Sequence, residues 1–106
     1  NSGKTREIVE LIPLARSLYA DLPIIVITGD PDSILADEAD IVLATGASPE
    51  VCPLGLTPTT STTMMTVIGD VLVVNVMDKT GFTIGEYAKR HHGGYLGHVS
   101  REKSTY

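Results

Sequence analysis

The segment from Ser48 to Thr63 is rich in side chains that could do chemistry. The carboxylate of Glu50 stands between Pro49 and Pro53, and six hydroxyl residues occupy the seven positions from 57 to 63. A carboxylate held in a stiff loop suits general base catalysis at a C–H or O–H group. A hydroxyl-rich helix start suits the binding of a polar, phosphorylated ligand. The segment therefore predicts a ligand site, with a solvated surface glutamate as the alternative reading of Glu50.

A second candidate site opens the chain. Ser2, Gly3, Lys4 and Thr5 precede a helical pattern, so their hydroxyls and backbone N–H groups would meet at a helix N-terminus. Such an arrangement can hold a phosphate group. An ordinary capped helix start is the alternative.

Three further residues could take part in chemistry. His91 and His92 precede Gly93-Gly94, a turn that lets the backbone approach a ligand closely. A titrating histidine suits proton transfer near neutral pH, although a solvated histidine is the simpler interpretation. Adjacent histidines seldom share one metal ion and no other ligands cluster in the sequence, so we expect no metal site. Cys52 is interpreted as a small buried residue.

The elements that position the first candidates follow an α/β pattern. Apolar residues recur at helical spacing from Ile8 to Tyr19, with Pro13 expected to kink the helix. Short β-branched runs at residues 22–27 and 40–44 are typical of strands buried on both faces of a parallel sheet, and residues 34–39 suit a short helix between them. This order predicts an α/β domain with a parallel sheet.

The second half is predicted to be helical. A run of about 20 residues from Pro58 to Asp78 is apolar almost all round, so we expect a helix buried on several sides that also packs on a second subunit. Thr83 is the predicted N-cap of another helix ending near Arg90, with Glu86 at the capping-box position. Residues 98–106 are polar and are expected to be frayed.

The bulk properties limit the function classes. The length fits one domain, and a net charge of −5 argues against non-specific nucleic-acid binding. A single cysteine favours a reducing, cytoplasmic compartment. The sequence shows no apolar run of the length that spans a bilayer, so no membrane partner is expected. Because the chain opens on Asn1 in what looks like a functional loop, it is interpreted as part of a larger domain.

Four blocks of the sequence together resemble the sugar isomerase (SIS) domain of D-arabinose 5-phosphate isomerases. The blocks are Asn1-Ser-Gly, the run Glu50-Val-Cys-Pro-Leu-Gly-Leu-Thr-Pro-Thr-Thr-Ser-Thr-Thr63, Gly69-Asp70, and His91-x-Gly-Gly-x-Leu-Gly97. The resemblance implies a flavodoxin-like, three-layer α/β/α sandwich with a parallel sheet, whose first strands lie outside this chain. Residues 1–106 would then be a partial SIS domain without the CBS modules that follow it in many relatives.

The resemblance also implies a reaction. The family interconverts D-ribulose 5-phosphate and D-arabinose 5-phosphate through an enediolate, without a cofactor, and usually as a homotetramer. Its product supplies the eight-carbon acid sugar Kdo for lipopolysaccharide and some capsules. Two alternatives stay open: a non-catalytic SIS regulator that binds a phosphosugar, and an isomerase of another phosphosugar.

Matching positions give the expected site residues. Glu50 is the expected base, with His91 opening the sugar ring or moving protons and Glu7 assisting. Phosphate and substrate binding falls to the first loop and the hydroxyl-rich helix start, at Ser2, Gly3, Thr5, Thr59, Thr60 and Ser61. The chain departs from the family at Lys4, where many relatives have an acidic residue, and at His92, where proline is usual. A family lysine from an earlier loop has no counterpart here.

Overall fold

The computed structural model describes residues 1–91 and 93–104. The chain forms two compact units, Asn1–Asp70 and Val71–Tyr106. Predictions that fall on His92 and on the last two residues lie outside the described part of the chain.

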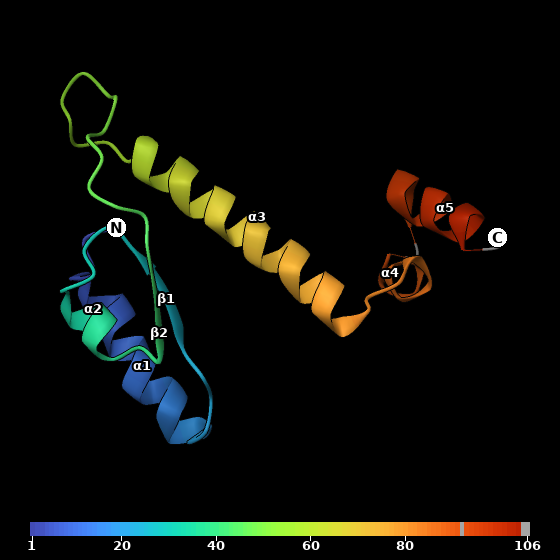
Figure 1. Cartoon of the computed structure of the whole chain (residues 1–106), viewed down its shortest axis with the longest axis horizontal. Helices are drawn as coiled ribbons and strands as arrows, with labels where there is room; N and C mark the ends of the chain where they lie inside the picture. Colours follow the sequence, from blue (N-terminus) through green and yellow to red (C-terminus); the bar gives the residue numbers. More distant parts are fainter. Residues whose placement is uncertain (92, 105–106) are drawn as a thin grey trace. The chain divides into compact units, whose positions relative to one another are not determined.

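The first unit contains a two-stranded parallel sheet, two complete helices and the first part of a third (Figure 1). In chain order these are α1 (Arg6–Leu18), β1 (Ile25–Thr28), α2 (Ile34–Asp37) and β2 (Ile41–Ala44). The strands pair in register from Ile25 with Ile41 to Thr28 with Ala44. The predicted order of helix, strand, short helix and strand is confirmed, and Pro13 lies inside α1 without ending it.

The core of this unit lies between the two helices and β1. Ile12 of α1, Val26 of β1 and Ala36 of α2 are its buried apolar side chains. The strands were predicted to be buried on both faces, and in this chain that prediction is wrong. Ile25 and Ile41 are 49% and 50% exposed, because the described helices cover only the other face of β1.

Hydrogen bonds and an ion pair join helix α1 to the amino-terminal end of the sheet. The Asp40 carboxylate accepts a hydrogen bond from the Ile24 backbone N–H at 2.7 Å and pairs with the Arg16 guanidinium at 3.2 Å. Arg16 also donates to the Glu38 carbonyl at 3.0 Å. The last turn of α1 is therefore joined to the starts of both strands.

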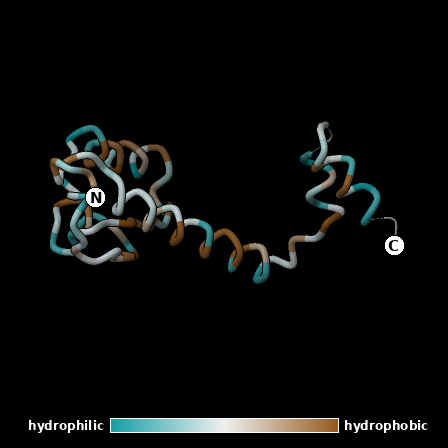
Figure 2. The backbone as a smooth tube through the Cα atoms, turned by 90° about the horizontal axis from the view of Figure 1, so that it is seen from above, coloured by the Kyte–Doolittle hydropathy of each residue, from teal (hydrophilic) through white to brown (hydrophobic). Residues whose placement is uncertain are grey.

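Helix α3 (Thr60–Thr80) begins in the first unit and ends in the second. It confirms the predicted long helix, but the prediction that it is buried on several sides is wrong for this chain, in which Ser61 is its one buried residue. Figure 2 shows hydrophobic residues along this segment. By length and composition alone α3 could cross a membrane, which corrects the expectation that the chain holds no run of that length.

The second unit adds α4 (Ile84–Arg90) and α5 (Gly94–Lys103). The Thr83 hydroxyl accepts the Glu86 backbone N–H at 3.2 Å, which confirms the predicted N-cap. The Glu86 carboxylate pairs with Lys89 and Arg90 instead of reaching back to the cap. The expectation of a frayed tail is wrong for residues 98–103, because α5 packs against α4 and buries Gly97 and Ser100.

Candidate functional site

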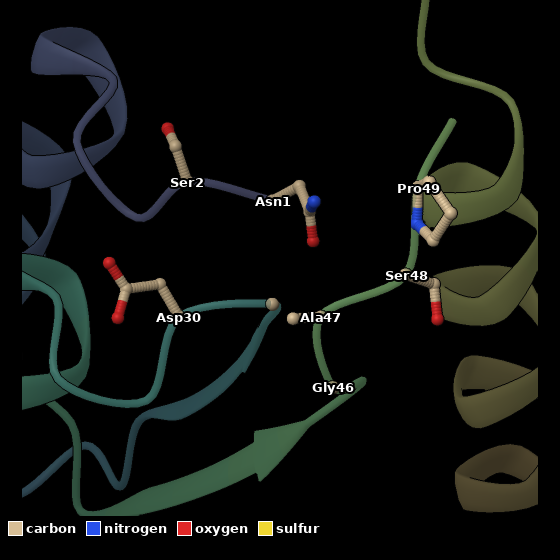
Figure 3. Close-up of a pocket in the computed structure, with 8 residues that line it drawn as sticks. Asn1, Ser2, Asp30, Gly46, Ala47, Ser48 and Pro49 are labelled. Atoms are coloured by element: carbon tan, nitrogen blue, oxygen red, sulfur yellow. The ribbon is translucent and has the colours of Figure 1, made fainter. Parts of the chain in front are cut away.

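A cavity of about 410 Å³ lies at the carboxyl ends of the two parallel strands. Figure 3 shows the three segments that line it, which are the start of the chain, the end of β1 and the loop after β2. The lining residues are Asn1, Ser2, Gly29, Asp30, Gly46, Ala47, Ser48 and Pro49. The carboxyl edge of parallel strands is where α/β proteins usually bind ligands.

Backbone hydrogen bonds fix the start of the chain against this edge. The Asn1 carbonyl accepts the Gly29 N–H at 2.9 Å and the Thr28 hydroxyl at 3.0 Å. The Gly3 carbonyl accepts the Leu35 N–H at 3.2 Å. The loop before α1 is therefore tied both to β1 and to α2.

Gly3 occupies a position that no other residue fits without a shift. Its φ is +62°, a conformation that L-residues rarely adopt. A Cβ atom there would lie 2.0 Å from Oγ of Ser33, a side chain that is 1% exposed. The glycine thus lets the loop approach the start of α2 closely.

The N-terminus of α1 keeps its donors available. Thr5 is the N-cap residue, and its side chain makes no capping hydrogen bond. Lys4 lies beside the cavity, where its ammonium group is 3.6 Å from the Asp30 carboxylate. Ser2, Gly3 and Thr5 therefore lie together at a helix start that can receive an anion.

Glu50 occupies the N-terminus of α3. Its Oε2 atom accepts hydrogen bonds from the Thr59 N–H at 2.7 Å, the Thr59 hydroxyl at 2.9 Å and the Ser61 N–H at 3.3 Å. The Ser61 side chain and then the Thr59 N–H are the main groups that lower the pKa of Glu50 to about 2. Glu50 directly follows Pro49, which lines the cavity at the strand ends.

Thr60 differs from its two neighbours. The Thr60 hydroxyl oxygen is buried without a hydrogen-bond partner among the described atoms. Thr60 also lines a second hollow of about 510 Å³ over the first turn of α3, together with Val51, Thr59, Thr62, Thr63 and Met64. Of the three predicted substrate-binding residues at the start of α3, Thr60 is the one whose hydroxyl is buried and unpaired among the described atoms.

Cys52 was expected to be a buried apolar residue, yet it is half-buried and takes part in the loop geometry. Its sulfur accepts N–H groups of Leu56 at 3.2 Å and Thr57 at 3.1 Å. Partial burial raises the pKa of the thiol, but hydrogen bonds led by Thr57 outweigh that effect and the pKa is lowered. Gly55 is the one residue in this turn whose type indicates a turn.

The two remaining predicted catalytic residues lie elsewhere. Glu7 is exposed in the first turn of α1. His91 is the C-cap residue of α4 in the second unit, where its ring stacks on Tyr87 with centroids 4.0 Å apart. The structure thus groups the loop at Ser2–Thr5 and the group around Glu50 within one unit, and it describes His91 only within the other. Among the described residues no three potential metal ligands gather.

The fold places the chain in the α/β class with a parallel sheet and a cavity at the carboxyl edge of its strands. The chain belongs to the SIS domain family, whose model matches residues 1–75. This confirms the resemblance inferred from the sequence, as well as the α/β class with a parallel sheet.

Individual proteins similar to this chain carry more specific names than the family does. The arabinose 5-phosphate isomerases KdsD of Escherichia coli K12 and of Pseudomonas aeruginosa are 46% and 44% identical over 97 residues. The alignments cover 92% of this chain, and this chain spans 29% of the length of these relatives. A crystal structure from Bacteroides fragilis, assigned as a phosphosugar isomerase involved in capsule formation, is 68% identical with a TM-score of 0.81. That match covers 90% of this chain and 50% of the other.

Proposed function

We propose that this chain supplies part of the active site of an aldose–ketose isomerase that interconverts D-ribulose 5-phosphate and D-arabinose 5-phosphate. The observation that carries the proposal is its 46% identity to arabinose 5-phosphate isomerases over nearly the whole chain. The Bacteroides fragilis structure adds a relative assigned to capsule formation. We propose that the product, D-arabinose 5-phosphate, is used to make Kdo for a capsule or lipopolysaccharide.

The substrate phosphate is assigned to the loop at Ser2–Thr5. This helix start has an N-cap whose side chain makes no capping bond, and Lys4 is nearby. The start of α3 already holds the Glu50 carboxylate, so a phosphate placed there would meet a like charge. The sugar would then extend from Ser2 across the cavity toward Pro49 and Glu50.

The proposed chemistry passes through an enediolate and needs no cofactor. A base removes the proton from the carbon beside the carbonyl and returns it to the neighbouring carbon. Glu50 takes this role, and His91, assisted by Glu7, moves the proton between the two oxygens. With a pKa of about 2, Glu50 is ionised at neutral pH and can accept a proton. Bound substrate that excludes water would raise its basicity.

The test is conversion of ribulose 5-phosphate by the natural full-length protein, with arabinose 5-phosphate detected as product. Glu50→Gln keeps the size of the side chain but cannot accept the proton, so we expect turnover to fall about 10²- to 10⁴-fold. Glu10→Gln is the matched control, because Glu10 makes only an exposed pair with Arg6.

Two results would contradict the proposal. Near-normal turnover by folded Glu50→Gln protein would remove Glu50 from the role of base. Failure of the unaltered protein to form arabinose 5-phosphate would remove the reaction, and a panel of other sugar phosphates would then identify or exclude a different isomerase.

One observation favours a second function, a phosphosugar-binding domain without catalysis. The Glu50 carboxylate caps α3 through three hydrogen bonds, a structural task that a binding domain also requires. Binding of arabinose 5-phosphate without turnover, unaffected by Glu50→Gln, would support this function.

The proposed setting is a cytoplasmic homo-oligomer, with a tetramer as the specific proposal. Although α3 is long enough to cross a membrane, it carries Asp70 and Asn75 in its middle, and polar groups there are costly in lipid. Its first turn binds Glu50 and most of its length lies inside the matched SIS family region. These observations favour α3 as a helix of the folded domain.

A further inference from the structure

We propose that Thr59 is a positioning residue for the isomerisation, fixing the Glu50 carboxylate by holding its Oε2 atom. This inference rests on the proposed function, since it concerns the residue assigned there as the base. It gives Thr59 a task other than the direct substrate contact expected from the sequence.

Thr59 holds the carboxylate from two directions. Its backbone N–H and its hydroxyl both donate to the same atom, Oε2 of Glu50, at 2.7 and 2.9 Å. Two donors from one residue restrict both the position and the rotation of the carboxylate. The Ser61 N–H adds a longer bond of 3.3 Å to the same oxygen.

The direction of the hydroxyl bond is itself fixed. The Thr59 Oγ1 atom accepts the Val51 backbone N–H at 3.1 Å. A hydroxyl has a single proton, and the Val51 N–H occupies an acceptor position, so the Thr59 proton points to Glu50. Thr59 therefore forms hydrogen bonds to both the Glu50 side chain and the Val51 backbone N–H.

The two carboxylate oxygens are consequently unequal. All three described hydrogen bonds to Glu50 end on Oε2. Within the described part of the chain no cation pairs with Glu50. Thr59 thus sets the orientation of the carboxylate at Oε2, while the Ser61 side chain acts on the same carboxylate as the main group that lowers its pKa.

Loss of the Thr59 hydroxyl should have two separable effects. The carboxylate gains freedom, and misplacement of a reacting group lowers the rate of the chemical step by about ten- to hundredfold. Glu50 also loses one of the donors that stabilise its charged form, so its pKa rises. A contribution of Thr59 that does not act through Glu50 would not move the titration of Glu50, and a purely structural contribution would not lower kcat.

The experiment uses the natural full-length protein with Thr59→Val, which keeps the shape and the backbone N–H but removes the hydroxyl. We expect kcat to fall about ten- to hundredfold while KM for ribulose 5-phosphate changes little. Thr59→Ser restores the hydroxyl and should restore kcat. Thr66→Val is the matched control, because the Thr66 hydroxyl bonds only the Thr62 carbonyl in the same helix.

The pH dependence supplies the second readout. The ratio of Thr59→Val to unaltered kcat/KM cancels the ionisation of the substrate phosphate. Because the variant's Glu50 has the higher pKa, this ratio should decline as the pH is lowered. Carbon-13 NMR titration of the Glu50 carboxyl, assigned with Glu50→Gln, should show the same upward shift without requiring any activity.

The outcomes separate this inference from the proposed function. An unaltered protein that lacks isomerase activity overturns the proposed function, and the NMR titration still decides whether Thr59 controls Glu50. An unchanged Glu50 titration, or a Thr59→Ser variant as impaired as Thr59→Val, overturns the positioning role. If Thr59→Val misfolds, Thr59→Ala, which removes the same hydroxyl without placing a methyl group beside the Glu50 carboxylate, takes its place in both measurements.

Discussion

Two buried hydroxyls support the loop that we assign to the substrate phosphate. Thr28 and Ser33 are each 1% exposed. The Thr28 hydroxyl donates to the Asn1 carbonyl at 3.0 Å and accepts the Asp30 backbone N–H at 3.1 Å, and Ser33 donates to the Asp30 carbonyl at 2.7 Å. Small buried polar groups of this kind are stable only when they are hydrogen-bonded. Their role is to hold the loop and the turn after β1 in one fixed geometry.

Gly3 gives the sharpest prediction at this scale. Gly3→Ala meets both the left-handed backbone conformation and a Cβ contact of 2.0 Å with Ser33. Gly55→Ala is the matched control, because Gly55 has a φ of +64° but open space around its Cβ position. The control should cost about 1–2 kcal/mol of stability, whereas Gly3→Ala should cost clearly more and also raise KM. Urea unfolding and steady-state kinetics measure both effects, and equal losses for the two variants would contradict the close-packing argument.

Single residues also show how far the sequence could be interpreted. The prolines on either side of Glu50 led to the prediction that its carboxylate is functional. The structure shows in addition that this carboxylate caps α3. Residue types could not reveal this, because the bond joins positions nine apart across an irregular loop. The turn around Cys52 could not be predicted for the same reason, because its sulfur accepts N–H groups from residues four and five positions further along the chain.

At the scale of elements, the N-cap of α4 connects local sequence to a proposed site residue. The Thr83 hydroxyl caps the helix whose C-cap residue is His91. The His91 ring is held by stacking on Tyr87 and by a 3.3 Å contact between its Nδ1 atom and the Tyr87 carbonyl. A less ordered α4 would therefore leave the histidine less well placed.

Thr83→Ala should destabilise α4 by about 1 kcal/mol, because the Glu86 N–H loses its acceptor. Thr83→Ser keeps the hydroxyl and should lose little. Thr80→Ala is a threonine control, since the Thr80 hydroxyl bonds only carbonyls of its own helix. Amide hydrogen exchange across residues 84–90 provides the measurement. Unchanged protection in Thr83→Ala would show that packing against α5 alone maintains the helix.

Elements defined by local patterns were predictable, and those defined by packing were not. The β-branched runs gave both strands, and the Thr83-x-x-Glu86 spacing gave the start of α4. Helix α5 was missed because its polar residues show no strong apolar period, whereas its actual support is contact with α4. The exposure of Ile25 and Ile41 likewise depends on which other elements cover the sheet, a fact that strand periodicity does not contain.

At the scale of the whole molecule, many apolar side chains of this chain are exposed to solvent. On α3 the exposed apolar side chains are Val67, Val71, Val73, Val74, Val76 and Met77. Burying one such side chain is worth about 1.5–3 kcal/mol, so several in one helix represent a strong drive toward association. Large contiguous patches of exposed apolar side chains usually mark an interface. They are the physical support for the proposed homo-oligomer.

Val74 offers a direct test of that proposal because it is 64% exposed in this chain. If a second copy covers α3, Val74→Glu would bury a charge, which is costly, and should split the natural full-length protein into smaller species. Thr66→Glu adds the same charge at an exposed polar position of the same helix and is the matched control. Light scattering after gel filtration gives the mass, and circular dichroism confirms folding. Folded, smaller Val74→Glu particles beside an unchanged control support association through α3. An unchanged mass contradicts it, and a loss of folding would show instead that Val74 packs within its own chain.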